Sequence, residues 1–78
     1  MTDLAKIRKE IDDVDSKLLE YFEYRMDLAH KVAQYKKKNG LPVFDSAREK
    51  EKLDSLKKLI KDKDNTDAVV ELFSQIMA

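Results

Sequence analysis

Two cationic side chains in the first half of the chain have types and a spacing that suit anion binding. Arg25 interrupts an apolar series whose steps of three and four residues have the period of a helix that buries one stripe. A guanidinium stays charged at any ordinary pH, so a buried position is costly unless an anion meets it there. Lys36 lies eleven residues later, about 20° around a helix and ~16 Å along it, so both side chains can converge on one small molecule. The apolar positions of the series are Leu4, Ile7, Ile11, Val14, Leu18, Tyr21, Leu28, Val32 and Tyr35.

Each charged residue of this kind also has a purely structural explanation. Arg25 could form an ion pair with an acidic residue across the seam, and Lys36 could extend its aliphatic stem along the rim of the core. Asp45, Arg48 and Glu49 stand at i, i+3 and i+4, so they share one face in the first turn of a second helix. A capping carboxylate and a surface ion pair would explain all three.

Arg8 can join the same pocket only if two chains pair. It lies seventeen residues before Arg25, ~25 Å along the same helix, too far for both to grip one metabolite within one chain. In an antiparallel pair of long helices, Arg8 of one chain returns alongside the pocket of the other. His30, the only histidine, has no acid or serine arrangement around it and is predicted to lie at the surface.

The composition favours one small domain that forms a homodimer. With 78 residues, we expect a single domain over 1–78, too small to be comfortably stable without a disulfide, a metal or a partner. The chain has no cysteine and no Cys/His cluster, so neither a disulfide nor a structural zinc site is expected. Oligomerisation is the remaining source of buried area.

The charge balance and the hydropathy of the chain argue against nucleic acid and membranes as partners. Sixteen basic and sixteen acidic side chains give a formal net charge of zero, so no global field draws the chain to nucleic acid or to anionic lipid. No apolar run approaches the roughly 18 residues of a membrane span, and no charged-then-apolar signal peptide opens the chain. We therefore expect a cytoplasmic protein that binds neither nucleic acid nor membrane.

Three helices are predicted to position these residues. The first runs from about Leu4 to Lys38 and ends at the only glycine and only proline, Gly40 and Pro42. The second begins at Asp45 as N-cap and continues to the charged run 61–64, which is predicted to be a loop. The third is capped by Asn65 or Thr66. The apolar residues of the second helix are Leu53, Leu56 and Ile60, and those of the third are Val69, Leu72, Phe73, Ile76 and Met77.

Nearly the whole chain, from Leu4 to about Phe73, resembles the all-helical chorismate mutase family. The resemblance is specific because the charged residues discussed above occur in the order and spacing in which the family carries pocket residues. It is carried by the strings Ile7 to Asp12 and Asp15 to Leu19, by Arg25, Lys36 and Pro42-Val43, and by the string Asp45 to Glu49. The resemblance implies an all-α fold, in which three helices per chain intertwine into a homodimer with two equivalent pockets.

The family rearranges chorismate to prephenate by a Claisen-type shift without cofactor, metal, covalent intermediate or proton transfer. Chorismate is a dicarboxylate, so the chemistry needs a fixed cationic clamp and donors where charge develops on the ether oxygen. By resemblance, Arg8 of the partner chain, Arg25 and Arg48 would bind the carboxylates. Lys36 would donate to the ether oxygen, and Glu49 would accept from the ring hydroxyl, helped by Asp45. Lys36, Arg25 and Glu49 would be the catalytic residues.

The chain departs from the family pattern at one place, and two alternative functions stay open. The family's third helix supplies a small hydroxyl residue and, a turn later, a glutamine that shares the ether oxygen with the lysine. Both positions fall beyond Ala78, and the adjacent Ser74 and Gln75 do not replace them, so weakened activity is expected. The alternatives are an isochorismate pyruvate-lyase on the same fold and a non-catalytic helical dimerisation or regulatory module.

Overall fold

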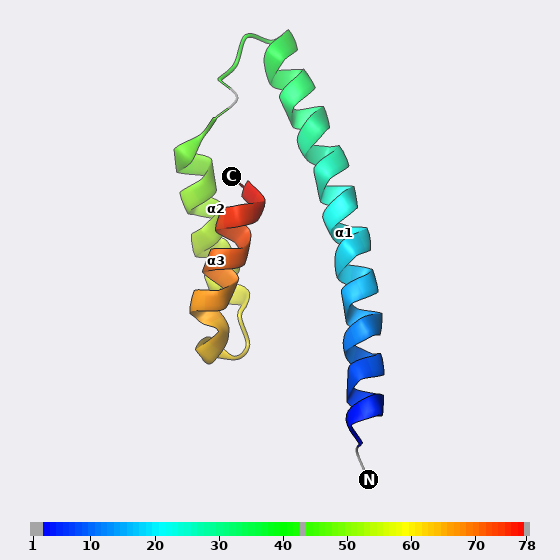
Figure 1. Ribbon diagram of the computed structural model, residues 1–78. Coiled ribbons are helices and arrows are strands. Elements are labelled where there is room, and N and C mark those ends of the chain that lie inside the picture. The colour runs from blue at the N-terminus through cyan, green and yellow to red at the C-terminus, as the bar shows by residue number, and fades with distance from the viewer. Residues whose placement is uncertain (1–2, 43, 78) are drawn as a thin grey trace. The chain divides into compact units, whose positions relative to one another are not determined.

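The computed structural model describes residues 3–42 and 44–77 of the chain, and every regular element within these ranges is a helix. Figure 1 shows the order of the elements, with α1 as the longest. No strand occurs within these two ranges, so the predicted all-α class with one long and two shorter helices is confirmed. Val43, part of the Pro42-Val43 pair, lies outside the described residues. The elements are α1 (Leu4–Lys38), α2 (Ser46–Leu59), the 3-10 helix η1 (Lys63–Asn65) and α3 (Thr66–Met77).

Both ends of α1 are fixed by capping interactions that the sequence predicted in part. The side chain of Asp3 accepts a hydrogen bond from the backbone N–H of Lys6 at 2.8 Å, which satisfies one of the unpaired donors of the first turn. At the other end, Gly40 adopts a φ of 65°, the left-handed conformation that commonly ends helices. The predicted end of the long helix at Gly40 is therefore confirmed.

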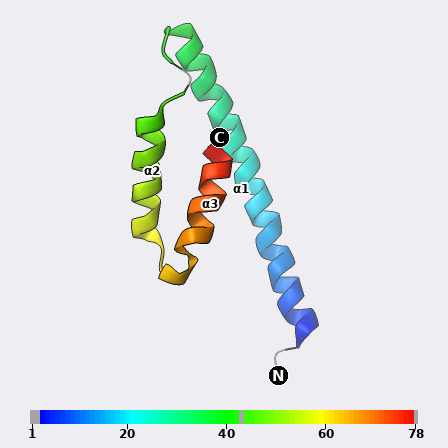
Figure 2. The ribbon, with the colours of Figure 1, turned by 60° about the vertical axis from the view of Figure 1, so that its left-hand side comes forward.

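The chain divides into two compact units, Met1–Val43 and Phe44–Ala78. Within the second unit α2 and α3 run in opposite directions and pack against each other, as Figures 1 and 2 both show. Seven of the eight apolar residues predicted for these helices are half-buried, namely Leu53, Leu56, Ile60, Val69, Phe73, Ile76 and Met77. The eighth, Leu72, is exposed. Whether the 78 residues act as a single domain stays a prediction.

The connection between α2 and α3 differs from the predicted loop. Residues 63–65 form a 3-10 turn, in which the backbone N–H of Asn65 donates to the Asp62 carbonyl at 3.0 Å. The side chain of Asp62 caps this turn by accepting a hydrogen bond from the N–H of Asp64 at 3.0 Å. Thr66 is the first residue of α3 rather than its cap, and its hydroxyl donates backwards to the carbonyl of Lys63 at 2.7 Å. Asn65, the alternative cap, is the last residue of this turn.

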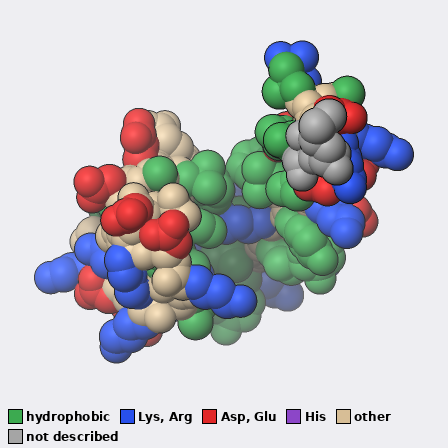
Figure 3. Space-filling model, turned by 90° about the horizontal axis from the view of Figure 1, so that it is seen from below, with side chains coloured by type: hydrophobic (Ala, Val, Ile, Leu, Met, Phe, Trp, Pro, Cys, Tyr) green, Lys and Arg blue, Asp and Glu red, His purple; other side chains and the backbone are tan. Residues whose placement is uncertain are grey.

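The apolar stripe of α1 is exposed in the single chain, where the sequence predicted a buried seam. None of the residues described for α1 is buried, and the exposed fractions of the stripe range from 41% for Ile7 to 72% for Tyr21. Figure 3 shows hydrophobic side chains gathered at the surface of the molecule. Within its own unit, Met1–Val43, no other helix is present to cover this stripe among the described residues. No helix among the described residues is both long and apolar enough to cross a membrane.

Candidate functional site

The long helix α1 carries three of the six candidate residues. Arg8, Arg25 and Lys36 belong to one continuous helix, so their separations follow from its rise: ~25 Å from Arg8 to Arg25 and ~16 Å from Arg25 to Lys36. Arg25 and Lys36 are half-buried, whereas Arg8 is exposed. Arg25 and Lys36 share a face of one rigid element, as the sequence predicted. Arg8 is too distant along the same helix to join them within one chain.

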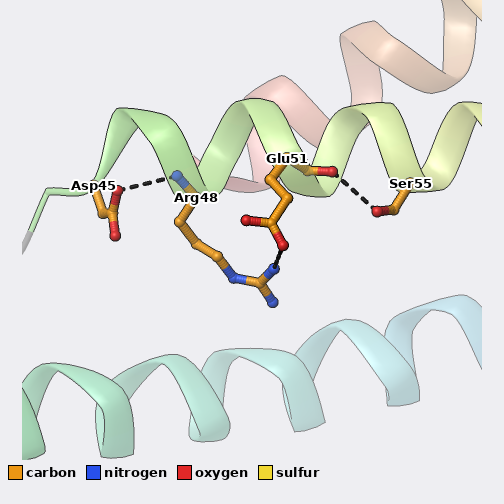
Figure 4. A network of polar contacts seen from close by, with 4 residues as sticks. All are labelled: Asp45, Arg48, Glu51 and Ser55. Atoms are coloured by element: carbon orange, nitrogen blue, oxygen red, sulfur yellow. Dashed lines mark hydrogen bonds and ion pairs between the residues drawn. The ribbon is translucent and has the colours of Figure 1, made fainter.

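The first turn of α2 carries the other three. The Asp45 carboxylate accepts a hydrogen bond from the backbone N–H of Arg48 at 3.0 Å, which makes Asp45 the N-cap of α2 (Figure 4). Because α2 starts at Ser46, Arg48 and Glu49 occupy the third and fourth positions of the helix. The predicted capping role of Asp45 is confirmed, and it fixes the start of the helix that presents Arg48 and Glu49.

The ion pair at this helix start involves a residue that the sequence interpretation missed. Arg48 Nη1 lies 3.7 Å from Glu51 Oε1, an i,i+3 pair, whereas the sequence interpretation sought the partner among Asp45, Arg48 and Glu49 (Figure 4). The i,i+3 spacing was the available signal. The two side chains are 62% and 73% exposed, and such pairs contribute roughly 0–1 kcal/mol, so an anionic ligand can readily displace Glu51 from Arg48. Ser55 donates its hydroxyl to the Glu51 carbonyl at 3.0 Å.

Glu49 has the properties of an acceptor that is available to a ligand. Its side chain is half-buried, unlike the exposed Arg48 and Glu51 beside it. Among the described residues, no cation lies within ion-pair distance of Glu49, since the one pair there joins Arg48 to Glu51. An ionised carboxylate only accepts hydrogen bonds. Glu49 can therefore accept from a ligand hydroxyl or ammonium group without first losing an internal partner.

The chemistry of these residues is that of recognition and electrostatic stabilisation. Arginine and lysine side chains bind carboxylates, and a fixed ammonium stabilises an oxygen that gains negative charge. The described ranges 3–42 and 44–77 contain no group of three or more His, Cys, Asp or Glu side chains that could hold a metal ion. His30 is exposed, as predicted. The two groups of candidates belong to different units, the first three to Met1–Val43 and the others to Phe44–Ala78.

The sequence matches the family described as chorismate mutase type II over residues 7–78. The chain belongs to this family. All six candidate residues fall within the matched range. The match covers α1 from Ile7 onward and all of α2, η1 and α3.

Individual relatives support the same assignment. A chorismate mutase of Methanocaldococcus jannaschii is 44% identical over 59 residues, which are 76% of this chain and 60% of that protein. A bifunctional chorismate mutase/prephenate dehydratase of Aquifex aeolicus is 34% identical over 62 residues, 80% of this chain and 17% of that protein. A 4-amino-4-deoxychorismate mutase of Streptomyces venezuelae is 35% identical over 46 residues, 59% of this chain and 45% of that protein. The chain thus spans less than two thirds of each of these relatives, and no solved structure matches it.

Proposed function

We propose that the protein is a chorismate mutase that rearranges chorismate to prephenate in the biosynthesis of phenylalanine and tyrosine. The observation that carries the proposal is the family match over residues 7–78, which includes all six candidate side chains. The chain's 44% identity with a chorismate mutase supports the substrate. A cytoplasmic location stays a prediction from the composition.

The reaction exchanges one bond for another within a single molecule. The ether C–O bond of chorismate breaks while a C–C bond forms between the enolpyruvyl arm and the ring, and no atom enters or leaves. The protein therefore needs to supply orientation and charge stabilisation, and a set of cations and acceptors is sufficient. This requirement agrees with a candidate site composed of arginine, lysine and carboxylate side chains.

In the proposed site the cations act on different parts of the substrate. Arg25 and Arg48 bind the carboxylates, and the weak pair between Arg48 and Glu51 yields to the substrate. Lys36 donates to the ether oxygen, whose negative charge appears mainly in the transition state. Glu49 accepts from the ring hydroxyl, and Asp45 supports this contact through the start of α2 that it caps.

The site is completed by Arg8 of a second copy of the chain. The exposed stripe on α1 supports a homodimer, because contiguous apolar surface of this kind marks a protein interface. The stripe recurs with alternating steps of three and four, the pattern of two helices packed along their length. In a parallel, in-register pair Arg25 would face its own copy, and the two like charges would repel. We therefore propose that the two α1 helices pair antiparallel.

A specific register satisfies this antiparallel pairing. In this register the numbers of two directly facing residues sum to 39, and every stripe position of one chain meets a stripe position of the other. Beside the stripe, Glu10 lies two residues from direct opposition to Lys31 of its partner. The side chains of Ile7, Glu10, Ile11 and Val14 line an open hollow on α1. Residues at i, i+3, i+4 and i+7 form the hole that receives one knob of a facing helix. The facing layers are Leu4–Tyr35, Ile7–Val32, Ile11–Leu28, Val14–Arg25 and Leu18–Tyr21.

The same register brings Arg8 to the proposed pocket. Facing residues that sum to about 39 place Arg8 of one chain opposite residues 29–31 of the other, between Arg25 and Lys36 along the helix. Each of those two side chains is then within about 10 Å along the axis, in place of ~25 Å within one chain. The two α1 helices would thus form two equivalent pockets, each receiving its Arg8 from the partner.

A direct assay tests the proposed reaction against its alternatives. The purified protein is incubated separately with chorismate, isochorismate and 4-amino-4-deoxychorismate, the last because one relative bears that substrate in its name. We expect prephenate from chorismate as the main activity. Pyruvate release from isochorismate alone would favour a lyase, and absence of turnover with all three would favour a non-catalytic helical module.

A further inference from the structure

We propose that Asn39, Gly40 and Leu41 act as positioning residues for Lys36. The inference rests on the proposed function of Lys36 and adds to it the means by which the backbone that carries its side chain is held. Lys36 lies in the last turn of α1, which ends at Lys38. Loss of a single turn at this end would release Lys36 from the helix, whereas Arg25, thirteen residues before the end, would stay in it.

Three groups beyond the helix bind the carbonyls of the turn that carries Lys36. The backbone N–H of Leu41 donates to the Lys36 carbonyl at 2.8 Å, and the N–H of Gly40 donates to the Lys37 carbonyl at 3.4 Å. These two bonds form a Schellman motif, the arrangement that satisfies the last carbonyls of a helix. The Asn39 side-chain amide donates to the Tyr35 carbonyl at 2.8 Å.

The conformation of Gly40 is what makes this cap possible. Its φ of 65° is strained for residues that carry a side chain, although asparagine tolerates it better than alanine. Apart from its two chain neighbours, no heavy atom of the residues that the structure describes would lie within 4 Å of a Cβ placed on Gly40. A substitution at this position therefore acts through the backbone conformation alone, without steric clash, so alanine and asparagine form a matched pair.

Substitution of Gly40 should lower kcat, the rate of the chemical step, and should change KM little. Gly40→Ala should lower kcat by roughly 5- to 30-fold, the factor by which a left-handed alanine shifts a local equilibrium. KM should change less than about twofold, because Arg25 keeps its place. Gly40→Asn should restore most of kcat. Asp3→Ala removes the cap at the opposite end of α1 and should leave kcat unchanged, which controls for a general loss of helix stability.

A double-mutant cycle with Lys36→Ala tests whether the cap acts through Lys36. Steady-state kinetics on chorismate are measured for the wild type, Gly40→Ala, Lys36→Ala and the double variant. If Gly40 positions Lys36, Gly40→Ala should have little further effect on kcat once the ammonium is gone. If the two substitutions lowered kcat multiplicatively in the double variant, or if Gly40→Ala and Gly40→Asn lowered it equally, the positioning role would be overturned. The proposed function would be unaffected by either result. A wild type without mutase activity would overturn the proposed function and this inference together.

Discussion

At the scale of single residues, Lys36 carries the largest expected contribution to the chemical step. Its ammonium acts on charge that appears mainly in the transition state, so Lys36→Ala should lower kcat by about 10²-fold or more. Removing one half-buried cation near a helix end should affect folding little. Thermal melts alongside kinetics would test this. If activity and stability fell together, Lys36 would be a packing residue at the rim of the core.

Arg25 permits a second test because catalysis and stability should respond in opposite directions. Arg25→Leu places an apolar side chain on an apolar stripe, so the free energy of unfolding should be unchanged or increased by about 1 kcal/mol or more. Activity should nearly vanish. The measurements are chemical denaturation and the chorismate assay. Strong destabilisation of the leucine variant would instead favour a structural ion pair at Arg25.

Residue type and spacing were enough to select the candidate residues but not all their internal contacts. The helical period placed Arg25 and Lys36 on one face, and the position of Asp45 before a helix predicted its role as N-cap. The pairing of Arg48 with Glu51 was missed, because Asp45 at i−3 and Glu51 at i+3 both lie within reach of this one exposed arginine. The roles proposed for the six residues stay predictions.

At the scale of elements, the helices were predictable wherever strong local signals agree. The long apolar period and Gly40 predicted both ends of α1, whereas the Asp3 cap at its start was not predicted. The turn at residues 63–65 was missed, since its charged residues lack an apolar period and it is held by local hydrogen bonds to Asp62 and Lys63. The apolar period correctly placed the stripe on one helix, α1. Its burial depends on contacts outside that helix, which the period of one sequence does not encode.

The proposed register of paired α1 helices gives a prediction at this same scale. In the double variant Ile11→Cys with Leu28→Cys, each Ile11 position should face a Leu28 position of the partner, so mild oxidation should yield a covalent dimer. The chain has no native cysteine to compete. Dilute oxidation followed by non-reducing electrophoresis measures the product.

Single-cysteine variants are the matched controls for that cross-link. In the antiparallel register two Ile11→Cys residues lie ~25 Å apart along the helices, so the single variant should stay monomeric on the gel. Efficient cross-linking of Ile11→Cys alone would indicate a parallel pair and would contradict the register.

At the scale of the whole molecule, the absence of buried side chains among the described residues agrees with a chain that needs a partner. The central claim is that each pocket takes Arg8 from one chain and Arg25 from the other. Arg8→Ala and Arg25→Ala should therefore each inactivate their own homodimers. In a heterodimer of the two variants, one pocket receives both substitutions and the other receives neither.

Subunit mixing of these two inactive variants tests the claim most directly. The variants are unfolded together in equal amounts and refolded, with each variant refolded alone as a control, and conversion of chorismate is measured. Random reassociation makes half of the dimers mixed, each with one intact pocket of two, so activity should recover to about one quarter of the wild-type level. No recovery despite confirmed heterodimers would contradict a pocket shared between chains.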